Sequence, residues 1–122
     1  MLIANAAITL TPAQSGSTIF VDQDAAFQIT LPPVQAGLNY RFVVSDVGAN
    51  AVNIGNVGGA HMNGTIAICV VGAANAVAVA GSSTVNFTAT SLLGDHIYVI
   101  SDGVIWYVDG ASRAAAGISA SA

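Results

Sequence analysis

The first candidates for acid–base chemistry are three aspartates near the C-terminus, Asp95, Asp102 and Asp109. If the residues between Asp95 and Asp102 form a strand, a rise of about 3.3 Å per residue separates the two carboxylates by roughly 23 Å. The paired carboxylates of glycosidases lie only about 5 to 10 Å apart. Asp95 and Asp109 would meet at the open end of a hairpin, where aspartates usually serve as turn residues. The spacing therefore predicts no catalytic dyad.

His96 is the next candidate, because a hairpin in this region would place it opposite Asp109 as a base with an orienting carboxylate. A nucleophile is missing from this arrangement, since Ser101 lies at the far end of the same predicted strand and the chain has no Gly-x-Ser-x-Gly elbow. We interpret His96 and Asp109 as a cross-strand polar pair that contributes a few tenths to about 1 kcal/mol. No catalytic residue and no enzymatic activity are expected.

Four side chains of the copper-ligand types occur in the chain: His61, Met62, Cys69 and His96. A blue-copper site requires two histidines and one cysteine that converge on one point. Cys69, however, lies within an apolar strand pattern, in which a buried thiol behaves as a small hydrophobic side chain. His61 and Met62 are expected in a loop. We therefore predict no metal site and no cofactor.

Trp106 and the three tyrosines could form a platform for sugars, which stack on aromatic faces. The alternation of apolar and polar residues instead buries Trp106 beside Val99 and Val108, and buried aromatic residues more often anchor a core or an interface. We interpret Trp106 as a core residue, and carbohydrate binding stays open as an alternative.

The elements that would position these residues are short strands, because apolar and small polar residues alternate in runs broken by Gly, Asn, Asp and Pro. Ten strands at this spacing predict an all-β fold, a β-sandwich or jelly roll. Alternation also assigns inward-facing sets, among them Tyr40 with Phe42 and Val44. Two further inward sets are Phe27, Ile29 and Leu31, and Val85 with Phe87. The predicted strands are 7–11, 18–21, 26–31, 38–45, 51–54, 65–71, 76–80, 84–89, 96–101 and 104–109.

The segment 94–110 is the strongest local signal, because Asp102-Gly103 separates two apolar runs and favours a two-residue hairpin turn. This register pairs Val99 with Trp106 and Ile97 with Val108 on one face. It places Tyr98, Tyr107, Ile100 and Ile105 on the other. A hairpin that is apolar on both faces cannot lie open to water on one side. We expect another subunit or a partner to cover part of it.

Charge is scarce in this chain, with six aspartates, two arginines and a net charge of −4. Charged residues make up 7% of the sequence, against about 25% in an average soluble domain. Nucleic-acid binding depends on clustered Lys and Arg, and Arg41 and Arg113 form no such cluster. The longest apolar run, Ile66–Gly81, is interrupted by Asn75 and is shorter than the about 20 residues of a membrane-spanning helix. Neither nucleic acid nor a membrane is an expected partner.

The hydrophobic fraction of 54% is high for so little charge, and it predicts that much of the monomer surface is covered by other copies in a homotrimer. The length suits one domain, residues 1–122. A single cysteine and an N-terminus without a basic region predict synthesis in a cytoplasm. The segment 46–81 is rich in Ala, Val, Asn and Gly. Its residues form either strands that pack against identical copies or loosely specified surface loops.

The two chain ends have few large apolar side chains. We expect residues 1–6 to form an N-terminal arm, with Met1, Leu2 and Ile3 as apolar anchors for a partner, and residues 111–122 to form a flexible tail anchored only by Ile118. An arm that is ordered only on docking loses roughly 1 to 2 kcal/mol of backbone entropy per residue. It would regain this free energy through burial and added main-chain hydrogen bonds.

Four segments together resemble the head decoration, or cement, proteins of tailed bacteriophages. They are GSTIFVD (16–22), FQITLP (27–32), AGLNYRFVV (36–44) and GDHIYVISDGVIWYVDG (94–110), and they cover about half of the chain. The residues that carry the resemblance are Leu31, Pro32, Gly37, Tyr40, Phe42, Gly94, Asp95, Asp102, Gly103, Trp106 and Tyr107. Similar modules also occur in tail-fibre and receptor-binding proteins.

The resemblance implies a trimeric β-sandwich on the outer face of the phage head, where it would bind the major capsid protein at local threefold positions and stabilise the shell. The motif residues are fold-forming in that family, and none carries chemistry. The alternative that the resemblance leaves open is a trimeric tail-fibre or receptor- or glycan-binding domain of the virion.

Overall fold

The computed structural model describes residues 2–55, 61–70 and 76–121. Within this part of the chain lie twelve strands and one short 3-10 helix, so the all-β prediction is confirmed. The strands of the first half are β1 (Leu2–Ala4), β2 (Ile8–Thr9), β3 (Thr18–Asp22), β4 (Phe27–Thr30), β5 (Asn39–Asp46) and β6 (Val52–Gly55), with the helix η1 at Pro12–Gln14. Those of the second half are β7 (Met62–Ile68), β8 (Ala76–Ser82), β9 (Thr84–Phe87), β10 (His96–Ser101), β11 (Trp106–Ser112) and β12 (Ile118–Ser121).

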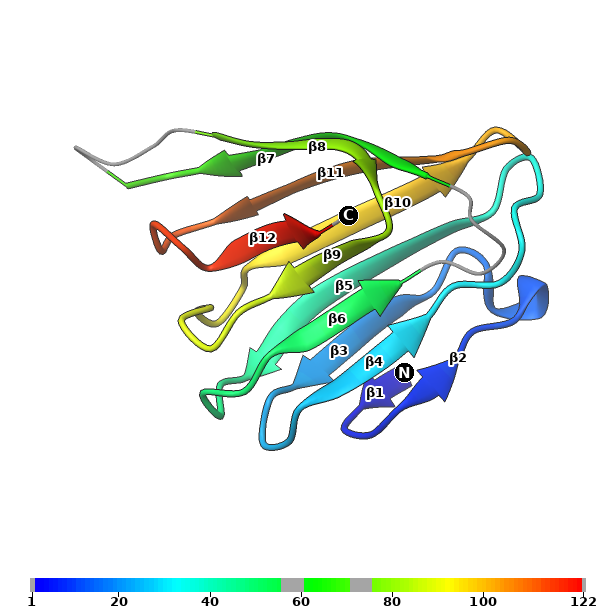
Figure 1. Cartoon of the computed structure of the whole chain (residues 1–122). Helices are drawn as coiled ribbons and strands as arrows, with labels where there is room; N and C mark the ends of the chain where they lie inside the picture. Colours follow the sequence, from blue (N-terminus) through cyan, green and yellow to red (C-terminus); the bar gives the residue numbers. More distant parts are fainter. Residues whose placement is uncertain (1, 56–60, 71–75, 122) are drawn as a thin grey trace.

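The strands form two sheets that pack face to face as a β-sandwich (Figure 1). The larger sheet has seven strands in the order β1-β3-β5-β10-β11-β7-β8, and the smaller has five in the order β12-β9-β6-β4-β2. In Figure 1, β1 and β2 lie on one side of the sandwich and β8 and β12 lie toward the other. No helix in the described residues has the length and apolarity needed to cross a membrane.

The first six strands alternate between the two sheets. As a result, β1, β3 and β5 run parallel in the larger sheet, and β2, β4 and β6 run parallel in the smaller one. The second half of the chain then completes both sheets with mainly antiparallel pairs. A jelly roll is built from antiparallel strands. The sandwich is therefore confirmed, and the mixed pairing excludes the jelly-roll form of the prediction.

The core lies between the sheets and contains the residues that the alternation placed inward. Tyr40, Phe42 and Trp106 are fully buried, and Tyr40 and Trp106 pack with ring centroids 6.2 Å apart. Ile29, Leu31, Val44, Val85 and Phe87 are also buried, while Phe27 packs against the core from a partly exposed position. The predicted inward faces are confirmed, because a period of two residues assigns a face wherever one side of a sheet is covered.

The hairpin of β10 and β11 forms, but the predicted register is wrong by two residues. Ser101 pairs with Trp106 and Val99 pairs with Val108, so the connection has four residues, 102–105. The carboxylate of Asp102 accepts hydrogen bonds from the N–H groups of Val104 and Ile105, at 2.8 and 3.0 Å, and these bonds stabilise the longer turn. A shift of two residues keeps every side chain on its predicted face.

Both chain ends belong to the sheets, which corrects the expectation of an arm and a flexible tail. Leu2–Ala4 pairs with β3 as an edge strand, and Ala4 is buried. Residues 106–112 form β11, and Ile118–Ser121 pairs with β9 through the buried Ile118. Short strands with one inward apolar residue are stable here because each adds main-chain hydrogen bonds to an existing sheet edge.

Strand β7 begins three residues earlier and ends three residues earlier than predicted. Met62 is therefore a buried strand residue and not a loop residue, while Cys69 lies just beyond the strand and is exposed. The prediction of a buried thiol is wrong because Ile66 and Ile68 occupy the inward positions of this strand. The segment 46–81 contributes strands to both sheets, and its residues 56–60 and 71–75 lie outside the described part.

Candidate interaction surface

Asp95 is a structural carboxylate, since it is only 2% exposed and accepts three hydrogen bonds. The donors are the N–H of Leu92 at 2.9 Å, the hydroxyl of Ser112 at 2.7 Å and the N–H of Arg113 at 3.1 Å. These bonds tie the turn before β10 to the end of β11. Gly94, which precedes Asp95, has a φ of 87° and allows the turn its left-handed backbone. The turn and cap role expected for Asp95 is confirmed.

The other residues considered for acid–base chemistry are not brought together. His96 pairs with Ala111, and Asp109 pairs with Tyr98, so the predicted His96–Asp109 pair is wrong for the same register reason as the hairpin. The ring Nδ1 of His96 lies 3.3 Å from the carbonyl oxygen of Gly94. His96 and Asp109 therefore take part in a turn and in sheet pairing and not in a shared site.

The copper-ligand types are also dispersed. Met62 is buried at the start of β7, and Cys69 lies beyond its other end. Seven residues of strand place these two sulfur atoms roughly 20 Å apart. The Nδ1 of His61 is 3.2 Å from the carbonyl oxygen of Gly81, on the β7–β8 side. His96 belongs to a different strand, so the four residues do not converge.

A cluster that the sequence analysis missed is formed by Asp22, Asp24 and Asp46, whose carboxylate oxygens lie within 4.8 Å of one another. It arises because β3 and β5 run parallel and place Asp22 beside Asp46. The neighbouring carboxylates of Asp22 and then Asp46 raise the pKa of Asp24. Carboxylate oxygens are ligands for hard cations. The sequence does contain a signal for this cluster: two aspartates, Asp22 and Asp24, lie two residues apart at the end of one strand, and Asp46 lies at the end of a neighbouring strand.

Trp106 does not form a sugar platform, because it is fully buried in the core. Its indole N–H has no hydrogen-bond partner among the described residues. Tyr40, which packs against it, donates a hydrogen bond of 2.6 Å from its hydroxyl to the carbonyl oxygen of Thr11. Both residues are core anchors, as the alternation predicts.

The outer surface of the larger sheet is rich in aromatic and aliphatic side chains, and we call it the seven-strand face. One row of register partners runs through Ile3, Phe20 and Val43 to His96. Another runs through Asn39, Ile100 and Tyr107. Of these, Ile3, Ile100 and Tyr107 are exposed, and Ile3 is 52% exposed at the sheet edge. The exposed Val104 stands next to this face in the hairpin turn.

Two charged residues of the seven-strand face, Arg41 and Asp109, are the register partners of Tyr98, and their row lies between the two apolar rows. The guanidinium of Arg41 lies over the ring of Tyr98 at 5.6 Å from its centroid, which is a cation–π distance. The hydroxyl of Tyr107 donates to the carboxylate of Asp102 at 3.0 Å. Hydrogen bonds from the backbone N–H groups of Ile105 and Val104 lower the pKa of Asp102, and this neighbouring carboxylate raises the pKa of Tyr107. The polar groups of this face are therefore held in fixed positions beside the apolar rows.

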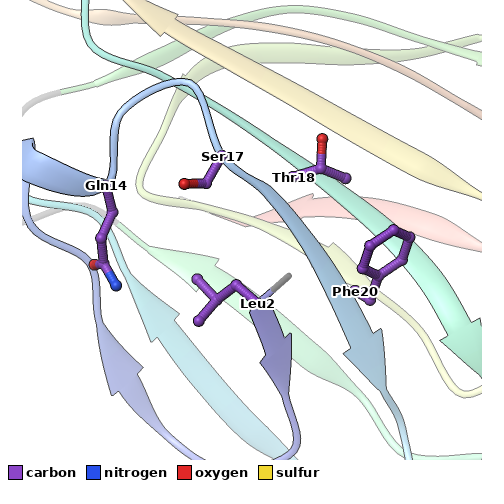
Figure 2. Close-up of a pocket in the computed structure, with 5 residues that line it drawn as sticks. All are labelled: Leu2, Gln14, Ser17, Thr18 and Phe20. Carbon is purple, nitrogen blue, oxygen red and sulfur yellow. The ribbon is translucent and has the colours of Figure 1, made fainter.

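A hollow of about 520 Å³ opens beside β1, where the seven-strand face meets its edge (Figure 2). Leu2 and Phe20 supply its apolar wall, and Gln14, Ser17 and Thr18 supply polar groups. Its size is in the range of pockets that accept a small ligand or a partner's side chain. Leu2 and the adjacent Ile3 are the two described residues of the predicted partner-binding segment. Met1, the third, lies outside the described residues.

The outer surface of the smaller sheet has a different chemistry, made of uncharged amides and hydroxyls. Ser119, Asn86, Asn53 and Gln28 form one row of register partners. Asn86 is 8% exposed and donates from Nδ2 to the hydroxyls of Ser119 and Ser121, at 3.3 and 3.2 Å. Its Oδ1 has no partner among the described residues. The two outer faces of the sandwich are thus chemically distinct.

The motif residues that carried the resemblance take up structural positions. Gly103 has a φ of 97° in the hairpin turn, and Gly37, with a φ of 89°, donates from its N–H to the carbonyl oxygen of Ser101. Tyr107 is the exception, since it is exposed on the seven-strand face. Comparison of the chain with protein-family models, with curated proteins and with solved structures gave no match.

Proposed function

We propose that this chain is a non-enzymatic decoration protein of a tailed-phage head, which binds the major capsid protein on the outer face of the shell as a homotrimer at local threefold positions. The observation that carries the proposal is the seven-strand face, where Ile3, Ile100 and Tyr107 are exposed beside the partly buried Phe20 and Val43. The resemblance of segments 16–22, 27–32, 36–44 and 94–110 to such proteins supplies the partner.

The two apolar rows, which the row of Arg41, Tyr98 and Asp109 separates, support a binding role because a partner that covers the face would bury their exposed side chains. Burying apolar area contributes roughly 25 cal/mol per Å². The hollow beside Leu2 suits a protruding side chain of a partner, and Arg41 over Tyr98 supplies a charged group beside the apolar rows. Protein–protein interfaces are enriched in aromatic residues and arginine.

The mechanism that follows is preferential binding to the assembled shell. A ligand that binds one state and not the other stabilises the bound state by about 4 kcal/mol per site at a thousandfold excess over Kd. A site that spans neighbouring capsid subunits exists only after assembly, so this free energy opposes loss of subunits. The chain would be made in the host bacterial cytoplasm and would act on the virion.

The proposal is tested by mixing the protein with undecorated capsids and measuring bound protein by sedimentation, with cryo-electron microscopy to find its position. Ile100→Asp places a carboxylate on the seven-strand face, and Gln28→Asp places one on the outer surface of the smaller sheet as the matched control. We expect Ile100→Asp to weaken capsid binding at least tenfold and Gln28→Asp to leave it within twofold. Absence of wild-type density on capsids would overturn the proposal.

The second candidate is a tail-fibre or receptor-binding domain, which is favoured by the amide and hydroxyl rows of the smaller sheet. Such a domain would bind host cells or glycans saturably and would not bind capsids. In that case Gln28→Asp, and not Ile100→Asp, would reduce binding. The same two variants therefore separate the two candidates.

A further inference from the structure

The free edges of the two sheets differ in length on the two sides of the sandwich. On one side, β1 and β2 end the larger and the smaller sheet with only three and two residues. On the other side the edges are β8, with seven residues, and β12, with four. A bulge at Gly81 interrupts the end of β8, so its regular edge is Ala76–Ala80. The β8/β12 side is therefore the one with substantial strand edges that no described residue pairs.

Among the described residues of this side, the bulge at Gly81 is a feature that protects a strand edge, and it affects only the end of β8. Natural proteins protect such edges with charged side chains, proline or very short strands. Residues 47–94, which include β8, contain no Asp, Glu, Lys or Arg, and neither do residues 114–122, which include β12. Ala76, Ala78 and Ala80 of β8 are exposed. An unprotected edge of this kind pairs readily with another strand.

We infer that β8 of one copy pairs with β12 of a second copy of this chain, and that this joint builds the homotrimer. Both edges are uncharged, so neither has to bury an unpaired charge against the other. Their regular lengths also match, five residues against four. Main-chain hydrogen bonds would satisfy the unpaired groups of both edges.

The placement of both edges on one side allows each copy to pair with two neighbours around one axis. Each copy offers β8 to one neighbour and β12 to the other, and Ser83, which links β8 to β9, donates from its N–H to the carbonyl oxygen of Ser121 in β12 at 2.8 Å. Two different edges give a heterologous joint, which closes into a ring if the rotation between neighbouring copies closes and forms an open filament if it does not; the inference is the closed threefold form. The inference rests on the trimer of the proposed function. It places the joint at the β8 end of the seven-strand face, in whose rows Ala78 and Ala80 lie, and it leaves the β1 and β10 part of that face, with Ile3 and Ile100, free for the capsid.

The test is disulfide trapping in mixed trimers. Two differently tagged chains are co-expressed in a Cys69→Ser background, one with Ala78→Cys and the other with either Ser119→Cys or Ala120→Cys. Successive strand residues alternate in side, so one of the two β12 cysteines faces the same side as the β8 cysteine. We expect a disulfide-linked heterodimer for one of the two combinations. Each single-cysteine chain expressed alone should give no linked dimer.

A second measurement covers variants that fail to cross-link for geometric reasons. Light scattering on a size-exclusion column should give a mass near three times 12.1 kDa for the wild type. Ala78→Lys should raise the subunit dissociation constant at least 100-fold, and Ala13→Lys, at an exposed position of η1, should leave it within twofold. A linked dimer from Ala78→Cys alone, a monomeric wild type or a trimer insensitive to Ala78→Lys would overturn the inference. Capsid binding by such a protein would leave the proposed function intact.

Discussion

Replacement of Asp95 by Asn is expected to destabilise the domain strongly although it removes only one charge. The buried carboxylate accepts hydrogen bonds from two backbone N–H groups and from the hydroxyl of Ser112. The asparagine amide retains one acceptor oxygen and turns its NH₂ toward at least one of these donors. A hydrogen bond to a charged group contributes about 1.5 to 3 kcal/mol, and an unsatisfied buried donor adds a further cost. We expect a loss of about 3 kcal/mol in the free energy of unfolding.

This loss is a large part of the about 5 to 15 kcal/mol that stabilises a typical domain, and it should lower Tm by on the order of 10 °C. The assay is urea unfolding at a fixed protein concentration, followed by the fluorescence of Trp106, which is the only tryptophan. Asp109→Asn is the matched control, because Asp109 is exposed on the same hairpin and should change stability by less than about 0.5 kcal/mol. An Asp95→Asn protein as stable as this control would refute the assignment of Asp95 as a structural carboxylate.

Three further predictions concern the core, the acidic cluster and one close strand approach. Trp106→Ala should lower the free energy of unfolding, measured by chemical denaturation, by about 3 to 5 kcal/mol. Trp106→Phe should lower it much less, because this change also removes the unpaired buried N–H. Equal losses in the two variants would contradict the prediction. The raised pKa of Asp24 means that its ionised form costs stability above that pKa, and the cost disappears as the pH falls below the unfolded value of 3.8. Asp24→Asn should therefore have a higher Tm than the wild type near pH 7 and an equal Tm near pH 3. A difference in Tm that persists in acid would argue against repulsion between the carboxylates of the cluster. Gly64→Ala should destabilise the domain strongly, because the added Cβ would overlap a backbone carbonyl of β11. An unchanged urea midpoint would show that β7 and β11 do not approach each other so closely.

Several features of the fold could be predicted from the sequence because they depend on the alternation of side chains along a strand. Tyr40, Phe42 and Trp106 were placed in the core by the alternation, and the predicted hairpin placed Tyr98, Ile100 and Tyr107 together on the face opposite Trp106. The alternation is a local property with a period of two residues. This also explains why the hairpin faces were correct although its register was shifted by two.

The register itself and the strand pairing depended on tertiary structure. The four-residue turn at 102–105 is stabilised by the side chain of Asp102, and two-residue patterning cannot distinguish it from a shorter turn. The chain ends could not be recognised as strands because three or four residues with one apolar anchor are stable only beside β3 or β9.

The proposed interaction surfaces depend partly on composition and partly on the fold. The scarcity of charge could be read from the sequence, and it predicted that part of the surface is covered by other chains. Only the fold decided that Ile3, Ile100 and Tyr107 share one face, and that the charge-free strands β8 and β12 end their sheets on the same side. Composition is a property of the chain alone, but whether residues about a hundred positions apart share a face is decided only when the strands have paired.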